Sequence, residues 1–165
     1  MTTITYIYTD GSSLNNADKN KRRAGCAYLV LQDNKYVYLS GRYLGEETNN
    51  FAELSAIYSA YCWMYHHQEK FYKNLTFFID SKYAINIVNK TNTPKVNKEL
   101  IDKIFTKEKI FIDNGFNISY KHIAAHTGKK DIHSKANDIV DKTAKKCATT
   151  KEDIKIKNFD KYYNR

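Results

Sequence analysis

Hydrophobic and polar positions alternate in the first part of the chain with the two-residue period of β-strands. Residues 4–9 alternate β-branched and aromatic side chains and end at Asp10-Gly11-Ser12, a sequence typical of a turn. After a polar loop at 15–23, two further strand-like runs at 25–31 and 35–44 are separated by a short polar segment, as in a hairpin. The pattern predicts three antiparallel strands, the first of which ends at an aspartate.

The next part of the chain changes to the period of an α-helix. Over residues 50–68 the apolar side chains recur every three or four positions, at Phe51, Leu54, Tyr58, Tyr61 and then Met64 or Tyr65. Residues 75–79 form a continuous apolar run, which is typical of a central strand buried on both faces. This predicted strand is followed directly by a second aspartate, Asp80.

Two helices, a strand and a final helix complete the pattern. Helices are predicted at 81–90 and at about 97–113, because Pro94 interrupts the segment between them and Asn114-Gly115 is a common helix stop. Residues 116–123 alternate again as a strand. The last helix has its inner face at Ala136, Ile139, Val140, Thr143, Ala144 and Cys147. This order of elements predicts an α/β fold with a mixed sheet, in which three antiparallel strands precede strands joined through helices.

Length and charge bound the organisation of the protein. The 165 residues are enough for one ordinary domain, which we assign to residues 1–150, followed by a Lys-rich tail at 151–165 that we expect to be loosely held. Twenty-seven Lys and Arg against 18 Asp and Glu give a net charge of +9. Such an excess attracts polyanions, so nucleic acid is the first partner to consider, although a charge excess that serves solubility explains the number equally well.

Membrane insertion and secretion are not expected. No apolar run approaches the roughly 20 residues of a membrane span, and the first residues are polar instead of basic and then apolar, as in a signal peptide. We therefore expect a cytoplasmic protein without membrane contact. The sequence implies no protein partner, and we expect a monomer.

Three acidic residues occupy positions where they could share a ligand. Asp10 and Asp80 follow predicted strands, and ligands of open α/β sheets bind beyond the carboxyl ends of strands. Glu53 lies in the first long helix beside its buried stripe. Taken singly, each acid is better explained as a turn cap or a solvated side chain. Taken together, clustered carboxylates repel one another unless a cation neutralises them, and oxygen-only ligands favour Mg²⁺ or Mn²⁺.

Four short segments carry the most specific signal in the chain. They are Tyr8-Thr9-Asp10-Gly11-Ser12, Thr48-Asn49-Asn50-Phe51-Ala52-Glu53-Leu54, Phe78-Ile79-Asp80-Ser81-Lys82-Tyr83 and His126-Thr127-Gly128. In order and spacing these segments resemble the signature blocks of the type 1 ribonuclease H family, over about residues 4–146. The resemblance implies a five-stranded mixed sheet with helices on both sides, and an endonuclease that hydrolyses the RNA strand of RNA/DNA hybrids without sequence preference.

The resemblance also implies a set of catalytic acids. Asp10, Glu53 and Asp80 match the first three acids of the family. The fourth lies in the last helix, where either Asp141 or Asp138 could serve. At about 100° per residue, Asp141 lies about 130° from the centre of the apolar face and Asp138 about 170°. Because Asp141 is nearer the sheet and also fits the family block better, we prefer it, and Asp138 stays a candidate.

The family mechanism uses two Mg²⁺ ions per site, for which Mn²⁺ is a possible substitute, and leaves 3′-hydroxyl and 5′-phosphate ends. By resemblance, Asp10 bridges the ions, Asp80 supports the ion that activates water, and Glu53 and Asp141 complete the other. His126 matches a family histidine that assists proton movement or product release, a task that suits a pKa near neutrality. Its alternative is a loop histidine bonded to the backbone.

Small polar residues match the substrate-binding positions of the family. Contacts to the RNA 2′-hydroxyl are implied for Gly11, Ser13, Asn16, Asn49 and Asn50, and contacts to phosphates of the DNA strand for Thr48 and Asn97. The structural alternatives are a turn role for Gly11 and helix-cap roles for Asn49 and Asn97.

One departure from the family concerns how the substrate is held. Many members insert a basic handle between the two middle helices, whereas here only residues 90–97 join them. Grip on the hybrid then depends on dispersed lysines and should be weak and sensitive to salt. The rival functions are a nuclease of the same fold with integrase-like or resolvase-like specificity, and a non-catalytic module that binds hybrids.

Overall fold

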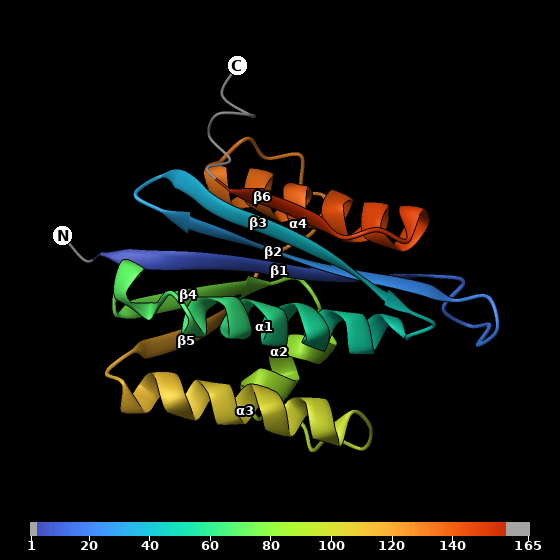
Figure 1. Cartoon of the computed structure of the whole chain (residues 1–165), viewed down its shortest axis with the longest axis horizontal. Coiled ribbons are helices and arrows are strands. Elements are labelled where there is room, and N and C mark those ends of the chain that lie inside the picture. Colours follow the sequence, from blue (N-terminus) through green and yellow to red (C-terminus); the bar gives the residue numbers. More distant parts are fainter. Residues whose placement is uncertain (1–2, 158–165) are drawn as a thin grey trace.

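Six strands form one mixed sheet in the computed structural model, which describes residues 3–157 (Figure 1). The strand order across the sheet is β5-β4-β1-β2-β3-β6. The parallel pairs are β1 with β4 and β4 with β5, and the other neighbours are antiparallel. The strands are β1 (Ile4–Leu14), β2 (Arg23–Gln32), β3 (Lys35–Gly45), β4 (Asn74–Ile79), β5 (Asn117–His122) and β6 (Ile154–Lys157).

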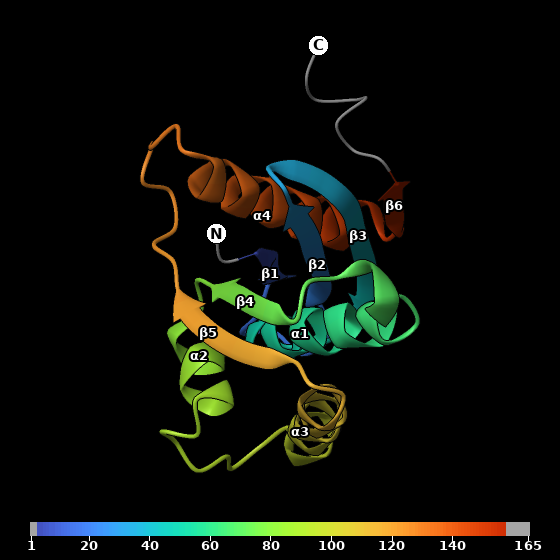
Figure 2. The same cartoon turned by 90° about the vertical axis from the view of Figure 1, so that its left-hand side faces the viewer.

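Helices cover both faces of the sheet, so the core has two layers (Figures 1 and 2). One face packs against α4, and the other against α1, with α3 packed on α1. The helices are α1 (Asn49–Tyr65), α2 (Lys82–Val88), α3 (Lys98–Asp113) and α4 (Ile132–Thr150), and a short 3₁₀ helix spans Gln68–Lys70. No helix in the described part of the chain is long and apolar enough to cross a membrane.

The alternation of strand residues explains the two layers. In β2, Ala27 and Leu29 belong to the cluster under α4, whereas Tyr28 and Val30 belong to the larger cluster under α1. Close packing of α4 requires Gly25, because a Cβ atom there would lie 2.3 Å from the carbonyl oxygen of Ala144. The predicted element order and the α/β class with helices on both sides are confirmed.

The number of strands was predicted wrongly, since the sheet has six and not five. The additional strand β6 pairs antiparallel with β3 at the sheet edge. It lies within the tail 151–165 that we expected to be loosely held, and it corrects that expectation for residues 154–157. The half-buried Ile154 and Ile156 alternate with the exposed Lys155 and Lys157. This two-residue period was not recognised because the segment is rich in lysine. The expectation for 158–165 lies outside the described residues.

Candidate active site

Three acidic side chains from separate elements meet where β1 and β4 run side by side. Thr9 pairs with Ile79 in parallel register. Asp10 and Asp80, the residues that follow this pair, therefore lie next to each other. Glu53 reaches the same point from α1. One carboxylate oxygen from each of the three acids lies within 4.8 Å of the other two. The sequence-based expectation that these residues share one crevice therefore agrees with the geometry.

The approach of α1 to β1 depends on Gly11. A Cβ atom at this position would lie 2.2 Å from the backbone nitrogen of Glu53 and 2.3 Å from the carbonyl carbon of Ala52. Because both are backbone atoms, no change of rotamer could relieve the overlap. The Gly11 backbone nitrogen also donates a hydrogen bond to Asp10 Oδ1 at 2.9 Å. Gly11 thus keeps Asp10 and Glu53 close together.

The three carboxyl groups are costly to ionise together. Asp10 is 3% exposed and Glu53 is 5% exposed. Burial, followed by the charge of Asp80, raises the pKa of Asp10 to about 8. Burial, followed by the charges of Asp10 and Asp80, raises the pKa of Glu53 well above its usual range, and burial also raises the pKa of Asp80. Within residues 3–157 no Lys, Arg or His nitrogen lies within 4.0 Å of a carboxylate oxygen of Asp10 or Glu53, so ionisation of all three acids is unfavourable without a cation.

A hard divalent cation fits this cluster. Glu53 Oε2 is buried and has no hydrogen-bond partner among the described residues. An orphaned carboxylate oxygen in this position is a free ligand atom, and all the donors of the cluster are carboxylate oxygens, which Mg²⁺ and Mn²⁺ prefer. The donor set is thus compatible with a metal site and leaves the identity of the ion open between these two.

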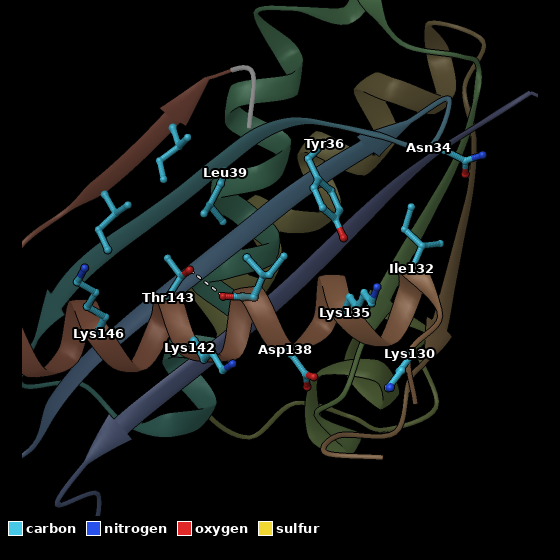
Figure 3. Close-up of a pocket in the computed structure, with 13 residues that line it drawn as sticks. Asn34, Tyr36, Leu39, Lys130, Ile132, Lys135, Asp138, Lys142, Thr143 and Lys146 are labelled. Carbon is cyan, nitrogen blue, oxygen red and sulfur yellow. Dashed lines mark hydrogen bonds between the residues drawn. The ribbon is translucent and has the colours of Figure 1, made fainter. Parts of the chain in front are cut away.

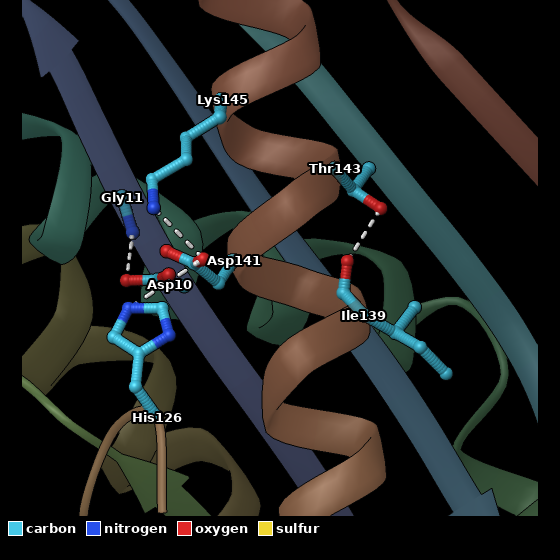
Figure 4. A network of polar contacts seen from close by, with 7 residues as sticks. All are labelled: Asp10, Gly11, His126, Ile139, Asp141, Thr143 and Lys145. Carbon is cyan, nitrogen blue, oxygen red and sulfur yellow. Dashed lines mark hydrogen bonds and ion pairs between the residues drawn. The ribbon is translucent and has the colours of Figure 1, made fainter. Parts of the chain in front are cut away.

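Asp141 lies on α4 at the edge of the cluster (Figure 4). Its side chain is 17% exposed, and its proximity to Asp10 contributes to the raised pKa of that residue. Lys145 Nζ contacts Asp141 Oδ2 at 2.9 Å, and His126 Nε2 lies 3.9 Å from the same oxygen. His126 itself is exposed in the loop before α4 and has a positive φ of 51°. Acid, lysine and histidine thus meet on the solvent side of Asp10.

Asp138 faces a different part of the surface. It is one of the residues, with Lys135 and Lys142, that line a groove formed by α4, β3 and β6 (Figure 3). Asp141, by contrast, points toward Asp10 (Figure 4). The geometry favours Asp141 over Asp138 as the fourth acid.

Two residues near the acids were not singled out from the sequence. Asn137 is 2% exposed, and its hydrogen bond to Asp80 lowers the pKa of that carboxyl. It lies in α4 directly before Asp138. Its place next to a candidate fourth acid was the signal in the sequence that could have identified it. His122 Nε2 lies 3.0 Å from the carbonyl oxygen of Asp80, and sequence reasoning gave it no role. Both residues fix the position of Asp80.

A profile of the RNase H family matches residues 2–149 of the chain. The protein belongs to the RNase H family. As a member of this family it is a ribonuclease, and the resemblance inferred from the four sequence segments is confirmed. A search of curated protein sequences finds no match.

Several solved structures have the same fold as this RNase H domain. RNase H1 from the archaeon Halobacterium salinarum is 18% identical, with a TM-score of 0.66 over 90% of this chain and 99% of its own. LC11-RNase H1 in complex with an RNA/DNA hybrid is 20% identical, with a TM-score of 0.67 over 89% of this chain and 98% of its own. Prototype foamy virus protease-reverse transcriptase is 21% identical, with a TM-score of 0.72 over 88% of this chain and 21% of its own.

Several of the predicted substrate-binding residues lie in the β1–β2 hairpin and at the start of α1, on the elements that also carry Asp10 and Glu53. Asn16 Oδ1 accepts a hydrogen bond from the Asn49 backbone nitrogen at 2.9 Å, and this contact ties the β1–β2 loop to the start of α1. Thr48 is the N-cap of α1, where its side chain accepts from the Phe51 nitrogen at 3.1 Å, so the cap role considered for Asn49 is wrong. Asn50 is exposed in the first turn.

Two further predicted residues have clear structural contacts. Ser13 Oγ donates to the carbonyl oxygen of Glu47 at 2.9 Å. Asn97 occupies the N-cap position of α3 with a φ of 59°, so the helix-cap interpretation gives its position correctly, but its side chain makes no capping hydrogen bond. Its Nδ2 donates instead to the Tyr83 hydroxyl of α2 at 3.4 Å. The segment 89–97 between α2 and α3 contains no helix, in agreement with the missing handle.

Proposed function

We propose that this ribonuclease hydrolyses the RNA strand of RNA/DNA hybrids as a metal-dependent endonuclease without sequence preference. The observation that carries the proposal is the convergence of the buried Asp10 and Glu53 with the half-buried Asp80, close enough to share a cation, on a protein with a net charge of +9. LC11-RNase H1, which shares the fold, has been crystallised with an RNA/DNA hybrid, and this supports the same substrate here. The expected products carry 3′-hydroxyl and 5′-phosphate ends.

We infer that Asp10, Glu53, Asp80 and Asp141 hold two Mg²⁺ ions, for which Mn²⁺ can substitute. When bound, the ions supply an activated water and charge stabilisation of the leaving 3′ oxygen. Asp10 must give up its proton for this, since its raised pKa keeps it largely protonated at neutral pH without a cation. The unpartnered Oε2 of Glu53 is available as a further ligand for the metal ion.

Two basic side chains, Lys145 and His126, act at the exposed rim of the site. Lys145 holds the Asp141 carboxylate at 2.9 Å, so it fixes the orientation of this acid and offsets its charge before a cation binds. His126 lies within reach of Asp141 in an exposed loop, where its imidazole can exchange protons with solvent and with a departing product. Neither residue can replace one of the acids, because neither supplies a carboxylate ligand to a metal ion.

Discrimination between RNA and DNA is assigned to polar groups beside the acids. We propose that Gly11, Ser13, Asn16, Asn49 and Asn50 contact 2′-hydroxyls, which can both donate and accept hydrogen bonds. Thr48 and Asn97 are assigned to phosphates of the DNA strand. The contact between Asn16 and Asn49 supports this assignment, because it makes the β1–β2 loop and the start of α1 one polar surface next to Asp10.

A comparison of four substrates tests the proposal. Labelled RNA/DNA hybrid, duplex DNA, duplex RNA and a four-way DNA junction are incubated with the protein and Mg²⁺, and in parallel with Mn²⁺. We expect cleavage of the RNA strand of the hybrid alone. Equal cleavage of duplex DNA or preferred cleavage of the junction would indicate an integrase-like or resolvase-like enzyme, and no cleavage with either ion would contradict a catalytic role. Monomeric state, lack of a protein partner and cytoplasmic location stay predictions.

A further inference from the structure

A cationic pocket lies at the tip of the β1–β2 hairpin, away from the acids. Its volume is about 280 Å³, and it lies between the hairpin loop, the end of β3 and the end of α4. Four basic side chains line it, against one acidic side chain, Glu46. The basic residues are Lys21, Arg22, Arg23 and Lys151. The pocket therefore has the charge and the concave shape of an anion site.

The positive charges of this pocket are poorly compensated by the protein. Only Lys21 forms an ion pair, a long contact of 3.9 Å to Asp18, and within residues 3–157 no carboxylate lies within 4.0 Å of the other three basic groups. Arg22 is half-buried, and its Nε has neither solvent contact nor a hydrogen-bond partner in the described residues. A partly buried guanidinium without a counter-charge is unfavourable, and an anion in the pocket would relieve this.

The pocket continues the surface that we assign to the substrate. Arg23 pairs with Leu14, which lies four residues beyond Asp10 on β1, or roughly 13 Å at the rise of a strand. This distance is well below the roughly 34 Å of one turn of a duplex, so one duplex can reach both sites. The hairpin loop that forms the pocket also carries Asn16, whose Oδ1 accepts a hydrogen bond from the Asn49 backbone nitrogen at the start of α1.

We propose that this pocket binds a backbone phosphate of the hybrid outside the cleavage site. The inference rests on the proposed function, because it concerns the same substrate. It answers how the hybrid is held although the segment between α2 and α3 contains no handle. Guanidinium groups bind phosphate oxygens with two hydrogen bonds, so Arg22 and Arg23 are the main ligands and the lysines add charge.

Inorganic phosphate tests the pocket without any reliance on nuclease activity. The full chain is titrated with phosphate while the NMR signals of the arginine Nε–H groups are followed. We expect the Arg22 and Arg23 signals to shift and the Arg42 signal to stay, because the Arg42 guanidinium already donates to Ser59 Oγ at 3.1 Å outside the pocket. Equal shifts of all three signals, or no shift of Arg22 and Arg23, would overturn the assignment of an anion site.

Hybrid binding tests whether the anion is the substrate backbone. Affinity for a labelled hybrid longer than one helical turn is measured by fluorescence anisotropy at several salt concentrations, in an Asp10→Asn background that prevents cleavage. We expect Arg22→Gln/Arg23→Gln to weaken binding about tenfold at low salt and to reduce the salt slope by about one to two. The matched control Lys107→Gln/Lys109→Gln removes the same charge from exposed or half-exposed positions on α3, and we expect a change below about twofold.

The outcomes separate the inference from the proposed function. If the double variant has a lowered Tm, Arg23→Gln alone is compared with Lys109→Gln alone, since both side chains are exposed. Equal losses for the pocket variant and its control would show that only net charge matters, and an unchanged salt slope would exclude a phosphate contact; either result overturns the inference. Failure of the proposed function would appear instead as absence of RNA cleavage by the unmodified protein.

Discussion

Neutralisation of Asp10 should stabilise the metal-free protein, and more so as the pH rises. Folding buries this carboxyl and raises its pKa from 3.8 to about 8, so between these values the folded state binds more protons than the unfolded state. Under that condition the stability of the folded state falls as the pH rises. Asp10→Asn replaces the acid with a neutral side chain of the same shape, so the variant lacks this loss.

The size of the effect follows from the pKa shift. One group that titrates in only one state changes stability by about 1.4 kcal/mol per pH unit, which gives up to about 4 kcal/mol between about pH 5 and about pH 8. Ionisation of Asp10 is coupled to that of Glu53 and Asp80, which share the cost, so we expect Asp10→Asn to gain about 2–4 kcal/mol over this range relative to the unmodified protein.

Urea denaturation with a chelator present measures this difference at the two pH values. Asp102→Asn is the matched control, since Asp102 is exposed on α3 outside the cluster, and we expect it to change stability equally at both pH values. Addition of Mg²⁺ should raise the Tm of the unmodified protein more than that of Asp10→Asn. The ion neutralises the ionised Asp10 carboxylate, and the variant has no carboxylate at this position. A stabilisation by Asp10→Asn that is the same at both pH values would refute the electrostatic explanation of the cluster.

Four further substitutions test the geometry of the site. Asp141→Asn should abolish turnover of the hybrid while Asp138→Asn leaves most of it, because only the first side chain faces Asp10; the reverse ranking in a cleavage assay would assign the fourth acid to Asp138. His126→Ala should slow steady-state turnover without abolishing it, since metal ions supply most of the charge stabilisation, and complete loss in a folded variant would contradict this. Gly11→Ala should destabilise the protein by about 3 kcal/mol and remove activity by pushing α1 away from β1; unchanged urea denaturation would mean that the helix can shift freely.

Local patterns were sufficient to predict most of the fold. Strand and helix periods are local properties, and the position of Asp80 directly after β4 follows from them. The prediction that the first strand ends at Asp10 is wrong, because β1 continues to Leu14 through its pairing with β2. The parallel register that brings these two acids together depends on the mixed sheet, which the element order already implied. Helix geometry also ranked Asp141 above Asp138, and in the structure Asp141 interacts with Asp10 whereas Asp138 lines a separate groove. The role of Asp141 as the fourth acid stays a prediction.

What could not be predicted depends on contacts between distant parts of the chain. β6 is stabilised by pairing with β3, and its four residues alone give too short a pattern to stand out among lysines. The burial of Glu53 depends on the backbone contact of α1 with Gly11, a residue that reads as a turn former in the sequence. The cationic pocket likewise needs Lys151 to lie beside Arg22 and Arg23, more than 100 residues earlier in the chain.

The central claim is that the acids of β1, α1, β4 and α4 hold divalent ions at the point where RNA is cut. Anomalous diffraction from a crystal grown with Mn²⁺ and a hybrid tests it most directly. The account predicts two manganese peaks about 4 Å apart, both in contact with Asp10, with Glu53, Asp80 and Asp141 completing their ligands. Peaks elsewhere on the protein, or none among these carboxylates, would contradict it.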